Sequence, residues 1–382
     1  MPNNFASLMN PAQIGFIALV VLGLATLLQV IYLLFYFLRL ARFKAGKGKA
    51  KGGEGVSVII VARNEYKNLE ANLQYFLEQD YPNYEVIVVN NGSWDSSQDL
   101  LETMELQYPH LKIVKIVEQE RYPKGKKFGL TLGIKAASNE WVLLSDSDCK
   151  PADRHWISSM QSHFTDSKSI VLGYSPYEKK SGLLNLFIRF ETFYTALQYM
   201  SFALAKQTYM GVGRNLAYRK SLFFSVKGFA SHNHIISGDD DLFVNETATS
   251  SNVTVNLDPD SFIYSKPKDS FGAWYQQKRR HLNTGKFYSA KSKWKLALLN
   301  VSHLLFYPAL ALSIIYWPVY YIPLAIYGFR LILQLSIYGP IMHKTKDLQP
   351  LYFLPFLDLL YFFYYFIAGF ATLFSRQKKK TW

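Results

Sequence analysis

Cysteine and charge are both scarce in this sequence. Cys149 is the single cysteine among 382 residues, so no disulfide can form within the chain and the fold does not rest on oxidative cross-linking. That usage suits a reducing compartment for any soluble part. Charged residues make up only 18% of the chain, against 49% hydrophobic residues that include 27 Tyr and 28 Phe. This composition excludes a disordered or low-complexity protein, because such chains lack the apolar side chains that a folded core buries.

Charge is missing altogether from a long run near the amino-terminal end. Residues 14–38 contain no Asp, Glu, Lys or Arg, and a helix of that length exceeds the roughly 30 Å hydrocarbon core of a bilayer. Uncharged residues precede the run and six basic residues follow it: Arg39, Arg42, Lys44, Lys47, Lys49 and Lys51. The run predicts a membrane-spanning helix, with residue 40 onward in the cytoplasm by the positive-inside rule. A cleaved signal peptide is the alternative, but its basic residues would precede a shorter apolar run.

Two more apolar runs lie toward the other end. Residues 296–329 carry no formal charge, and residues 351–375 carry only Asp358. They predict two or three further membrane helices; four spans in total would place the basic tail outside, against the positive-inside rule, and three would keep it inside. Prolines in these runs also permit re-entrant or in-plane helices. The formal net charge is +14, and we interpret the basic segments 39–51 and 376–380 as contacts to anionic lipid headgroups, not as a nucleic-acid surface.

Between the membrane regions, runs of strand-forming residues alternate with stretches of helical periodicity. Strands are expected at 56–61, 85–89, 112–117 and 140–144, and helices at 67–79, 95–106 and 126–137. Nearly continuous apolar strands joined by helices predict a mainly parallel, Rossmann-like α/β sheet that is covered on both faces. Ligands bind beyond the carboxyl ends of such strands, so the loops that follow the four strands are where we expect the chemistry.

The loop after the fourth predicted strand contains two carboxylates. Asp146 and Asp148 are one residue apart in an extended segment, so their side chains point the same way. Two like charges held together are costly unless a cation lies between them, and all-oxygen ligation favours Mg²⁺ or Mn²⁺, often completed by substrate phosphates. An Asx turn or a helix cap ahead of residues 151–160 is the structural alternative. At the end of this strand we favour the metal site.

Amide and lysine side chains follow the other strands. Asn64 and Glu65 come after the first strand and residues 90–93 after the second. An Asn side chain offers both a donor and an acceptor, which matches the edge of a base such as uracil, and Gly92 allows a tight turn beside a ligand. Turn chemistry alone explains Asn-Gly equally well. Residues 124–127 would bring lysine to a diphosphate, or would simply form a solvated helix start.

A basic helix is expected at residues 274–281. Gln277, Arg280 and His281 fall at i, i+3 and i+4 and share one face, so that an arginine and an amide can converge on one anionic group. A helix that lies on lipid headgroups is the alternative.

Taken in order, these motifs resemble those of the family-2 inverting glycosyltransferases, over roughly residues 55–290. The resemblance implies a GT-A nucleotide-sugar-binding domain. The implied donor-side residues are Asn64 and Glu65 near the nucleotide, Asn91 at the uracil, Lys126 in the Gly-Lys segment, and Asp146 and Asp148 as the metal-binding Asp-x-Asp. Asn91 departs from the family pattern, which usually has an acidic residue there, and this leaves the choice of base open.

Two further elements extend the resemblance toward the acceptor and the catalytic base. Residues 211–217 resemble the glycine-containing segment that lines the acceptor side, which implies that role for Gly213, Arg214 and Asn215. Residues 238–241 resemble the acidic motif that supplies the base. Anchoring on the glycine puts the base on Asp240 and anchoring on the Asp-Leu pair puts it on Asp239; we favour Asp240. Three adjacent carboxylates are costly unless their roles are divided.

The basic helix resembles the family's Gln-x-x-Arg-Trp motif, in which the arginine meets the diphosphate and the tryptophan borders the acceptor. Gln277 and Arg280 match it, and His281 replaces the tryptophan. That replacement weakens the case for a cellulose-type processive synthase.

The expected protein is therefore a membrane-bound, inverting, metal-dependent glycosyltransferase. It would move a sugar from a nucleotide-diphosphate donor, in first place a UDP-sugar, to a lipid-linked or glycan acceptor at the cytoplasmic face of a bacterial inner membrane. A processive polysaccharide synthase and a non-catalytic nucleotide-binding membrane scaffold are the alternatives. The expected segments are a transmembrane helix at 12–40, a basic linker at 41–54, the GT-A domain at 55–295, a membrane region at 296–375 and a basic tail at 376–382.

Overall fold

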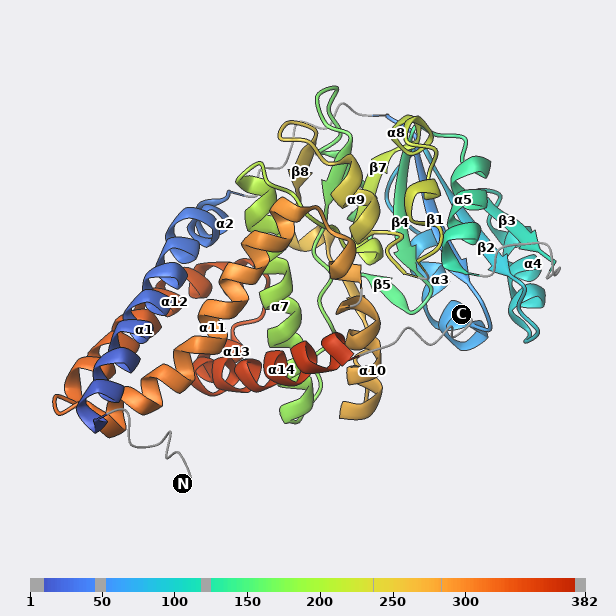
Figure 1. Cartoon of the computed structure of the whole chain (residues 1–382). Helices are drawn as coiled ribbons and strands as arrows, with labels where there is room; N and C mark the ends of the chain where they lie inside the picture. Colours follow the sequence, from blue (N-terminus) through green and yellow to red (C-terminus); the bar gives the residue numbers. More distant parts are fainter. Residues whose placement is uncertain (1–9, 45–52, 118–124, 236, 283, 375–382) are drawn as a thin grey trace. The chain divides into compact units, whose positions relative to one another are not determined.

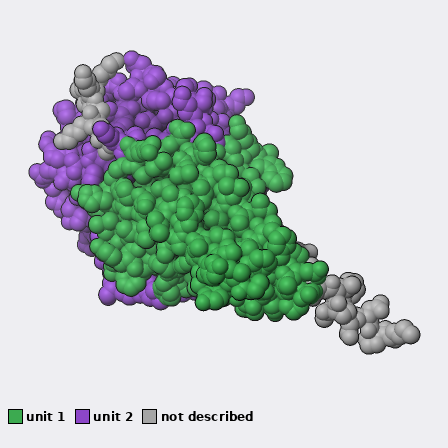
Figure 2. Space-filling model, turned by 90° about the vertical axis from the view of Figure 1, so that its left-hand side faces the viewer, with its two compact units in different colours: residues 1–42, 290–375 green, residues 43–289, 376–382 purple. Residues whose placement is uncertain are grey.

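The structure is a computed structural model that describes residues 10–44, 53–117, 125–235, 237–282 and 284–374 (Figure 1). The chain divides into two compact units, which are coloured separately in Figure 2. The helical unit comprises the described part of residues 1–42 and 290–375, and the sheet unit comprises the described part of residues 43–289. Most of the expected linker at 41–54 and the whole tail at 376–382 lie outside the described residues.

The sheet unit is built on seven strands in the order β3-β2-β1-β4-β7-β6-β8. In chain order these are β1 (Val56–Ala62), β2 (Tyr84–Asn91), β3 (Leu111–Ile116), β4 (Trp141–Asp146), β6 (Ile170–Leu172), β7 (Leu216–Arg219) and β8 (Val253–Val255). The first four are mutually parallel, β7 is antiparallel to both of its neighbours, and β8 is parallel to β6. The predicted mainly parallel α/β sheet is thus confirmed.

Helices cover both faces of β1, which explains why its sequence is apolar without alternation. All seven residues of β1 are buried. Val58 and Ile60 belong to the same buried cluster as apolar side chains of α3 (Tyr66–Leu77). The intervening residues point to the other face. There α5 (Lys126–Ala136) packs so closely that a Cβ on its Gly133 would lie 2.7 Å from Ile59.

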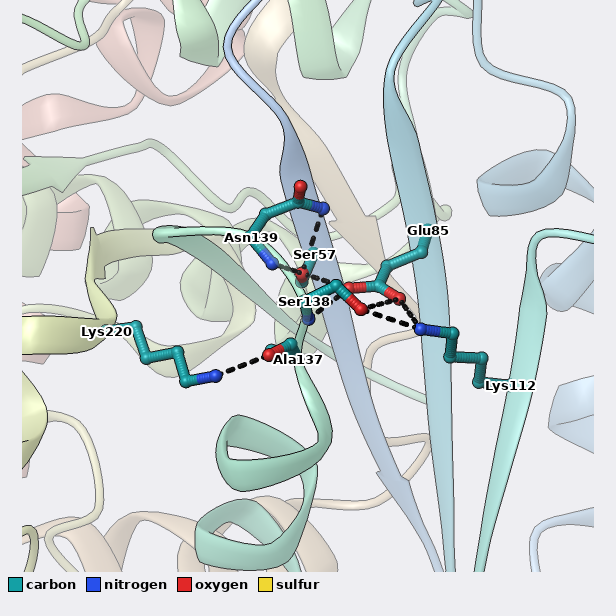
Figure 3. Close-up of polar contacts among 7 residues, drawn as sticks. All are labelled: Ser57, Glu85, Lys112, Ala137, Ser138, Asn139 and Lys220. Carbon is teal, nitrogen blue, oxygen red and sulfur yellow. Dashed lines mark hydrogen bonds and ion pairs between the residues drawn. The ribbon is translucent and has the colours of Figure 1, made fainter.

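The amino ends of the strands carry a buried polar cluster that has a structural role (Figure 3). The carboxylate of Glu85 accepts hydrogen bonds from the Ser57 hydroxyl and the Ser138 backbone, each at 2.6 Å, and pairs with Lys112 at 2.5 Å. Burial alone would raise the pKa of Glu85, but the bonds from Lys112, Ser57 and Ser138 outweigh it and lower that pKa. The hydrogen-bonding groups of this cluster therefore satisfy one another.

The sheet unit also contains a second, smaller sheet and further helices. A separate antiparallel pair joins β5 (Cys149–Pro151) to β9 (Ile263–Ser265). The helices are α4 (Ser97–Gln107), α6 (Trp156–Gln161), α7 (Leu183–Leu204), α8 (Lys220–Ser225), α9 (Asp241–Thr247) and α10 (Phe271–Leu282). Of these, α7 is buried along most of its length.

The helical unit contains three helices that are long and apolar enough to cross a membrane: Pro11–Arg42, Ala290–Tyr316 and Tyr321–Lys344. The first consists of α1 (Pro11–Tyr32), a π-helical turn η2 (Leu33–Phe37) and α2 (Leu38–Arg42), and it begins at an Asn10 capping box. The second and third are α11 and α12, into which the uncharged run at 296–329 divides. After α13 (Gln349–Tyr352) comes α14 (Leu354–Phe374), whose described apolar stretch is shorter.

A buried ionic network links the helices of this unit. Arg330 of α12 donates to Asp358 of α14 at 2.8 Å and to Gln29 of α1 at 2.5 Å. Tyr307 of α11 donates to the same carboxylate at 2.6 Å. Both charged side chains are almost fully buried, so each one depends on the other for compensation.

Candidate active site

Carboxylates gather at the carboxyl end of β4, where the sequence predicts a metal site. Ligand atoms of Asp146, Asp148 and Cys149 all lie within 4.8 Å of one another. Burial raises the pKa of Glu65, and the negative charges of the nearby Asp148 and Asp146 raise it further. Burial and those two carboxylates also raise the pKa of the Cys149 thiol. Sulfur is a soft ligand and Mg²⁺ and Mn²⁺ prefer oxygen, so the oxygen pair is what fits either ion.

Lys126, at the start of α5, lies between this carboxylate pair and the acidic motif at residues 238–241, which we call the acidic turn. Its Nζ lies 2.6 Å from Asp146 Oδ1 and 3.2 Å from Asp239 Oδ2. Burial disfavours its charge, yet Asp146, Asp239 and Asp240 raise the pKa of Lys126 well above the ordinary lysine value. The two acidic motifs thus lie around one ammonium group. Lys124, the first of the three lysines in the predicted diphosphate segment, lies outside the described residues.

The neighbouring lysine has a different task. Lys127 donates to the backbone carbonyls of His232 and Ile235 at 2.7 and 2.9 Å. Burial lowers its pKa to about 8. Lys127 therefore holds the loop that leads into the acidic turn, and it does not face the carboxylate pair.

The three carboxylates of the acidic turn have different environments. Asp239 pairs with Lys126, as described above. The Oδ2 atom of Asp240 accepts the backbone N–H of Gly213 at 2.7 Å, and its Oδ1 accepts the N–H of Asp241 at 2.8 Å, which caps α9. Burial, followed by the charges of Asp239 and Asp241, raises the pKa of Asp240 to about 7. Gly238 has φ +91°, a conformation that favours glycine, and it lets the turn pass close to Leu242.

Asp241 anchors the segment that follows α10. Its Oδ2 accepts the Tyr288 hydroxyl at 2.8 Å and also the Thr284 hydroxyl, and its Oδ1 accepts the backbone N–H of Leu242 at 2.8 Å. Burial raises its pKa, while these two hydroxyl donors oppose the rise. Nothing in the spacing of Thr284 and Tyr288 points to Asp241, so these two contacts could not be predicted from the sequence.

The loops after β1 and β2 are tied together. Asn64 has φ +55°; its backbone N–H donates to Ser93 Oγ at 2.9 Å, and its side-chain oxygen accepts the backbone N–H of Trp94 at 3.0 Å. The amide of Asn91 is buried and donates to the Gly125 carbonyl at 3.4 Å. Trp94 is 82% exposed at the end of this loop and was not identified from the sequence.

The predicted acceptor-side segment is the short helix η3 (Gly213–Asn215). Asn215 is fully buried, and both of its side-chain N–H groups are used by the carbonyls of Tyr174 and Ser261, at 2.8 and 2.7 Å. Asn215 therefore holds the segment in place and offers no amide N–H to an acceptor. Arg214 stacks over the Tyr177 ring at 4.7 Å.

The helix α10 is seated on α7 by two contacts one turn apart. The Trp274 and Phe187 rings meet edge to face at 5.5 Å, and Lys278 forms an ion pair with Glu191. The buried Gln277 Oε1 has no hydrogen-bond partner among the described residues. Arg280 and His281 belong to α10 by their backbone, and their side chains lie outside the described residues.

Two family models match the chain. The model for glycosyl transferase family 2 matches residues 57–224, and the model for glycosyl transferase family group 2 matches residues 141–372. The second match covers more than half of the chain.

Among curated proteins, the chain is similar to a poly-beta-1,6-N-acetyl-D-glucosamine synthase of Staphylococcus epidermidis, with 32% identity over 25% of this chain and 22% of the relative. It is also similar to the UDP-Glc:alpha-D-GlcNAc-diphosphoundecaprenol beta-1,3-glucosyltransferase WfaP of Escherichia coli, with 28% identity over 32% of this chain and 46% of the relative. The matched stretches thus span less than half the length of either relative.

A solved structure with a similar fold is the mannosyltransferase PcManGT from Pyrobaculum calidifontis, in complex with GDP-Man and Mn²⁺. Its TM-score is 0.61 at 19% identity, and the alignment covers 95% of this chain and 100% of that one. At this identity the likeness shows the fold alone.

Proposed function

The chain belongs to glycosyl transferase family group 2, and from this premise we propose that it is an inverting, metal-dependent enzyme that transfers a sugar from a nucleotide-diphosphate donor. The observation that carries the proposal is the position of Lys126, which lies within ion-pair distance of both Asp146 and Asp239. A scaffold has no need to hold two acidic motifs around one ammonium group. The arrangement suits an enzyme that handles a diphosphate beside a base, because it keeps positive charge at the place where both would act.

The proposed donor site uses the ends of β1, β2 and β4. Asn64, Glu65 and Asn91 are assigned to the nucleoside, and a UDP-sugar is the first candidate because an amide matches the edge of uracil. WfaP, by its name, uses UDP-Glc, whereas the mannosyltransferase with the similar fold binds GDP-Man, so both nucleotides belong in the test.

The diphosphate is assigned to positive charge from two helices. Lys126 at the start of α5 and Arg280 on α10 would bind its oxygens, and Gln277 would donate a hydrogen bond from its amide. Asp146 and Asp148 would hold Mg²⁺ or Mn²⁺, which when bound supplies further neutralisation of the leaving group.

Asp240 is the proposed base. Its pKa of about 7 places it near the optimum for general-base catalysis at neutral pH, since a base is most effective when its pKa lies near the working pH. The acceptor oxygen forms a bond to the anomeric carbon while the bond from that carbon to the diphosphate oxygen breaks. The hydroxyl proton passes to Asp240, and the diphosphate leaves with the electron pair. Gly213 and Arg214 are assigned to the acceptor side, together with His281.

The proposed acceptor is lipid-linked, because three helices among the described residues are long and apolar enough to cross a membrane and WfaP, by its name, acts on a diphosphoundecaprenol-linked sugar. We propose that the sheet unit faces the cytoplasm, and the basic residues that follow the first apolar helix support this orientation. In this proposal the GT-A domain spans residues 55–295, between a membrane helix at 12–40 with its basic linker at 41–54 and a membrane region at 296–375 with a basic tail at 376–382. A processive polysaccharide synthase is the second candidate, since a poly-N-acetylglucosamine synthase is among the relatives.

The test measures nucleoside diphosphate release by the full-length protein in detergent. UDP-Glc, UDP-GlcNAc and GDP-Man are offered with a polyprenyl-diphosphate-linked sugar, in Mn²⁺ and in EDTA. We expect release that depends on both acceptor and Mn²⁺, with one or a few sugars added to the lipid. Long products on a sizing gel would favour the polysaccharide synthase, and nucleotide binding without release from any donor would favour the scaffold.

A further inference from the structure

A line of buried polar groups leads to Asp148 from the acceptor-side segment. Cys149 and Ser265 are register partners in the β5–β9 ladder and are 0% and 2% exposed. Their Sγ and Oγ atoms are 3.1 Å apart. Arg214 Nη1 donates to Ser265 Oγ at 2.8 Å, and the Cys149 thiol donates to Asp148 Oδ1 at 3.5 Å. Three contacts thus connect Arg214 to a predicted metal ligand.

The chemistry of the two ends fixes the direction of every bond in this line. A guanidinium has only donors and an ionised carboxylate has only acceptors. Ser265 therefore accepts from Arg214 and gives its own hydrogen to the Cys149 sulfur, whose hydrogen goes to Asp148. A hydroxyl or thiol at each of the two middle positions can satisfy this order, because each middle group must both accept and donate.

We propose that Arg214, Ser265 and Cys149 form a relay that positions the Asp148 carboxylate for the metal, with Cys149 as a hydrogen-bond donor to the ligand and not as a ligand itself. The proposal rests on the proposed function, since it takes Asp148 as a metal ligand. Groups that orient a metal ligand typically change metal affinity about 10- to 100-fold when they are removed.

The relay also links two parts of the site that the chain connects only through its fold. Arg214 lies in η3, next to Gly213, whose N–H donates to Asp240. Arg214 is held from its other side by the Ser175 carbonyl at 3.3 Å and by the Tyr177 ring. We therefore expect a displacement of the acceptor-side segment to alter the hydrogen bonds that position Asp148.

The test measures Mn²⁺ binding to the full-length protein in detergent, by the loss of the electron paramagnetic resonance signal of free Mn²⁺, alone and with UDP. Cys149→Ala and Ser265→Ala interrupt the relay, and both are expected to weaken Mn²⁺ binding about tenfold. Cys149→Ser keeps a donor and is expected to stay within about threefold of wild type. Ser261→Ala is the matched control, because Ser261 is equally buried and its hydroxyl bonds only to the Asp258 carbonyl among the described residues, at 2.6 Å.

Unchanged thermal unfolding temperatures show that the variants are folded. If a variant unfolds at a lower temperature, the Mn²⁺ affinities of the remaining folded variants are compared instead. Ser265→Thr, which retains the hydroxyl, is then expected to bind Mn²⁺ as the wild type does. Wild-type affinity in both alanine variants would overturn the relay. Equal losses in Cys149→Ser and Cys149→Ala would make the thiol a ligand and overturn it too. If the wild type bound no Mn²⁺, the relay would fall, whereas the proposed transferase activity would still be decided by the release assay.

Discussion

The ion pair between Lys278 and Glu191 gives a quantitative test of how α10 is held. The two side chains are 12% and 6% exposed, so removing one partner leaves the other charge buried without compensation. Such a loss costs roughly 3–5 kcal/mol. Because Thr195 still donates to Glu191 at 3.2 Å, we expect the lower end, about 3 kcal/mol, for Lys278→Met. For a unit of about 250 residues, that corresponds to a drop of roughly 6–12 °C in the unfolding temperature.

The double variant Glu191→Gln with Lys278→Met removes both charges and is expected to lose less than the sum of the two single variants. The assay is thermal unfolding of the full-length protein in detergent, followed by near-ultraviolet circular dichroism. Lys135→Met, at an exposed position of α5, is the matched control. UDP binding should weaken in parallel, since α10 also carries Gln277 and Arg280. An unfolding temperature unchanged in Lys278→Met, or fully additive losses in the double variant, would refute the reasoning.

Three further predictions concern charged groups in both units. Transfer should rise with pH through about 7, because Asp240 must lose its proton to act as a base; a rate flat from pH 5.5 to 8.5 would contradict this. Glu85→Gln should lower stability at pH 7 by about 1–3 kcal/mol. Because folding lowers the pKa of Glu85, its carboxylate stabilises the fold at pH values above the pKa it has in the unfolded chain, and this stability is lost as the pH falls through the folded-state pKa. The stability of the variant should therefore depend less steeply on pH in the acid range. Asp358→Asn should cost about 3 kcal/mol by leaving Arg330 buried and unpaired, and an unaltered melting curve in detergent would argue otherwise.

The sequence was most informative where local pattern and topology agree. The runs at 56–61 and 85–89 correspond to β1 and β2, because β-branched residues that are buried on both faces leave an unmistakable apolar run. The rule that ligands bind at the carboxyl ends of parallel strands led directly to Asp146, which is the last residue of β4.

Contacts between residues that lie far apart along the chain could not be predicted from the sequence. The uncharged run in the sequence ends before Arg330, yet α12 continues through Arg330 to Lys344. The charge of Arg330 is compensated within the unit by Asp358 of α14. The apolar helix α7 was not predicted. This helix contains the buried Glu191, whose charge is compensated by Lys278 of α10.

The acidic turn shows the same limit at the scale of a single motif. Three successive aspartates look alike in the sequence. In the structure Asp239 faces Lys126, Asp240 caps α9 and accepts from Gly213, and Asp241 accepts hydroxyls from Thr284 and Tyr288. Their roles divide through contacts with residues that lie far away along the chain.

The most direct test of the central claim compares two aspartate variants in donor binding and in turnover. Asp240→Asn should abolish sugar transfer and leave Mn²⁺-dependent donor binding largely intact, whereas Asp148→Asn should weaken that binding itself. Asp99→Asn, at an exposed site on α4, controls for the loss of one negative charge. Wild-type turnover in both site variants would contradict the account, because it would mean that the two acidic motifs do not act on one diphosphate.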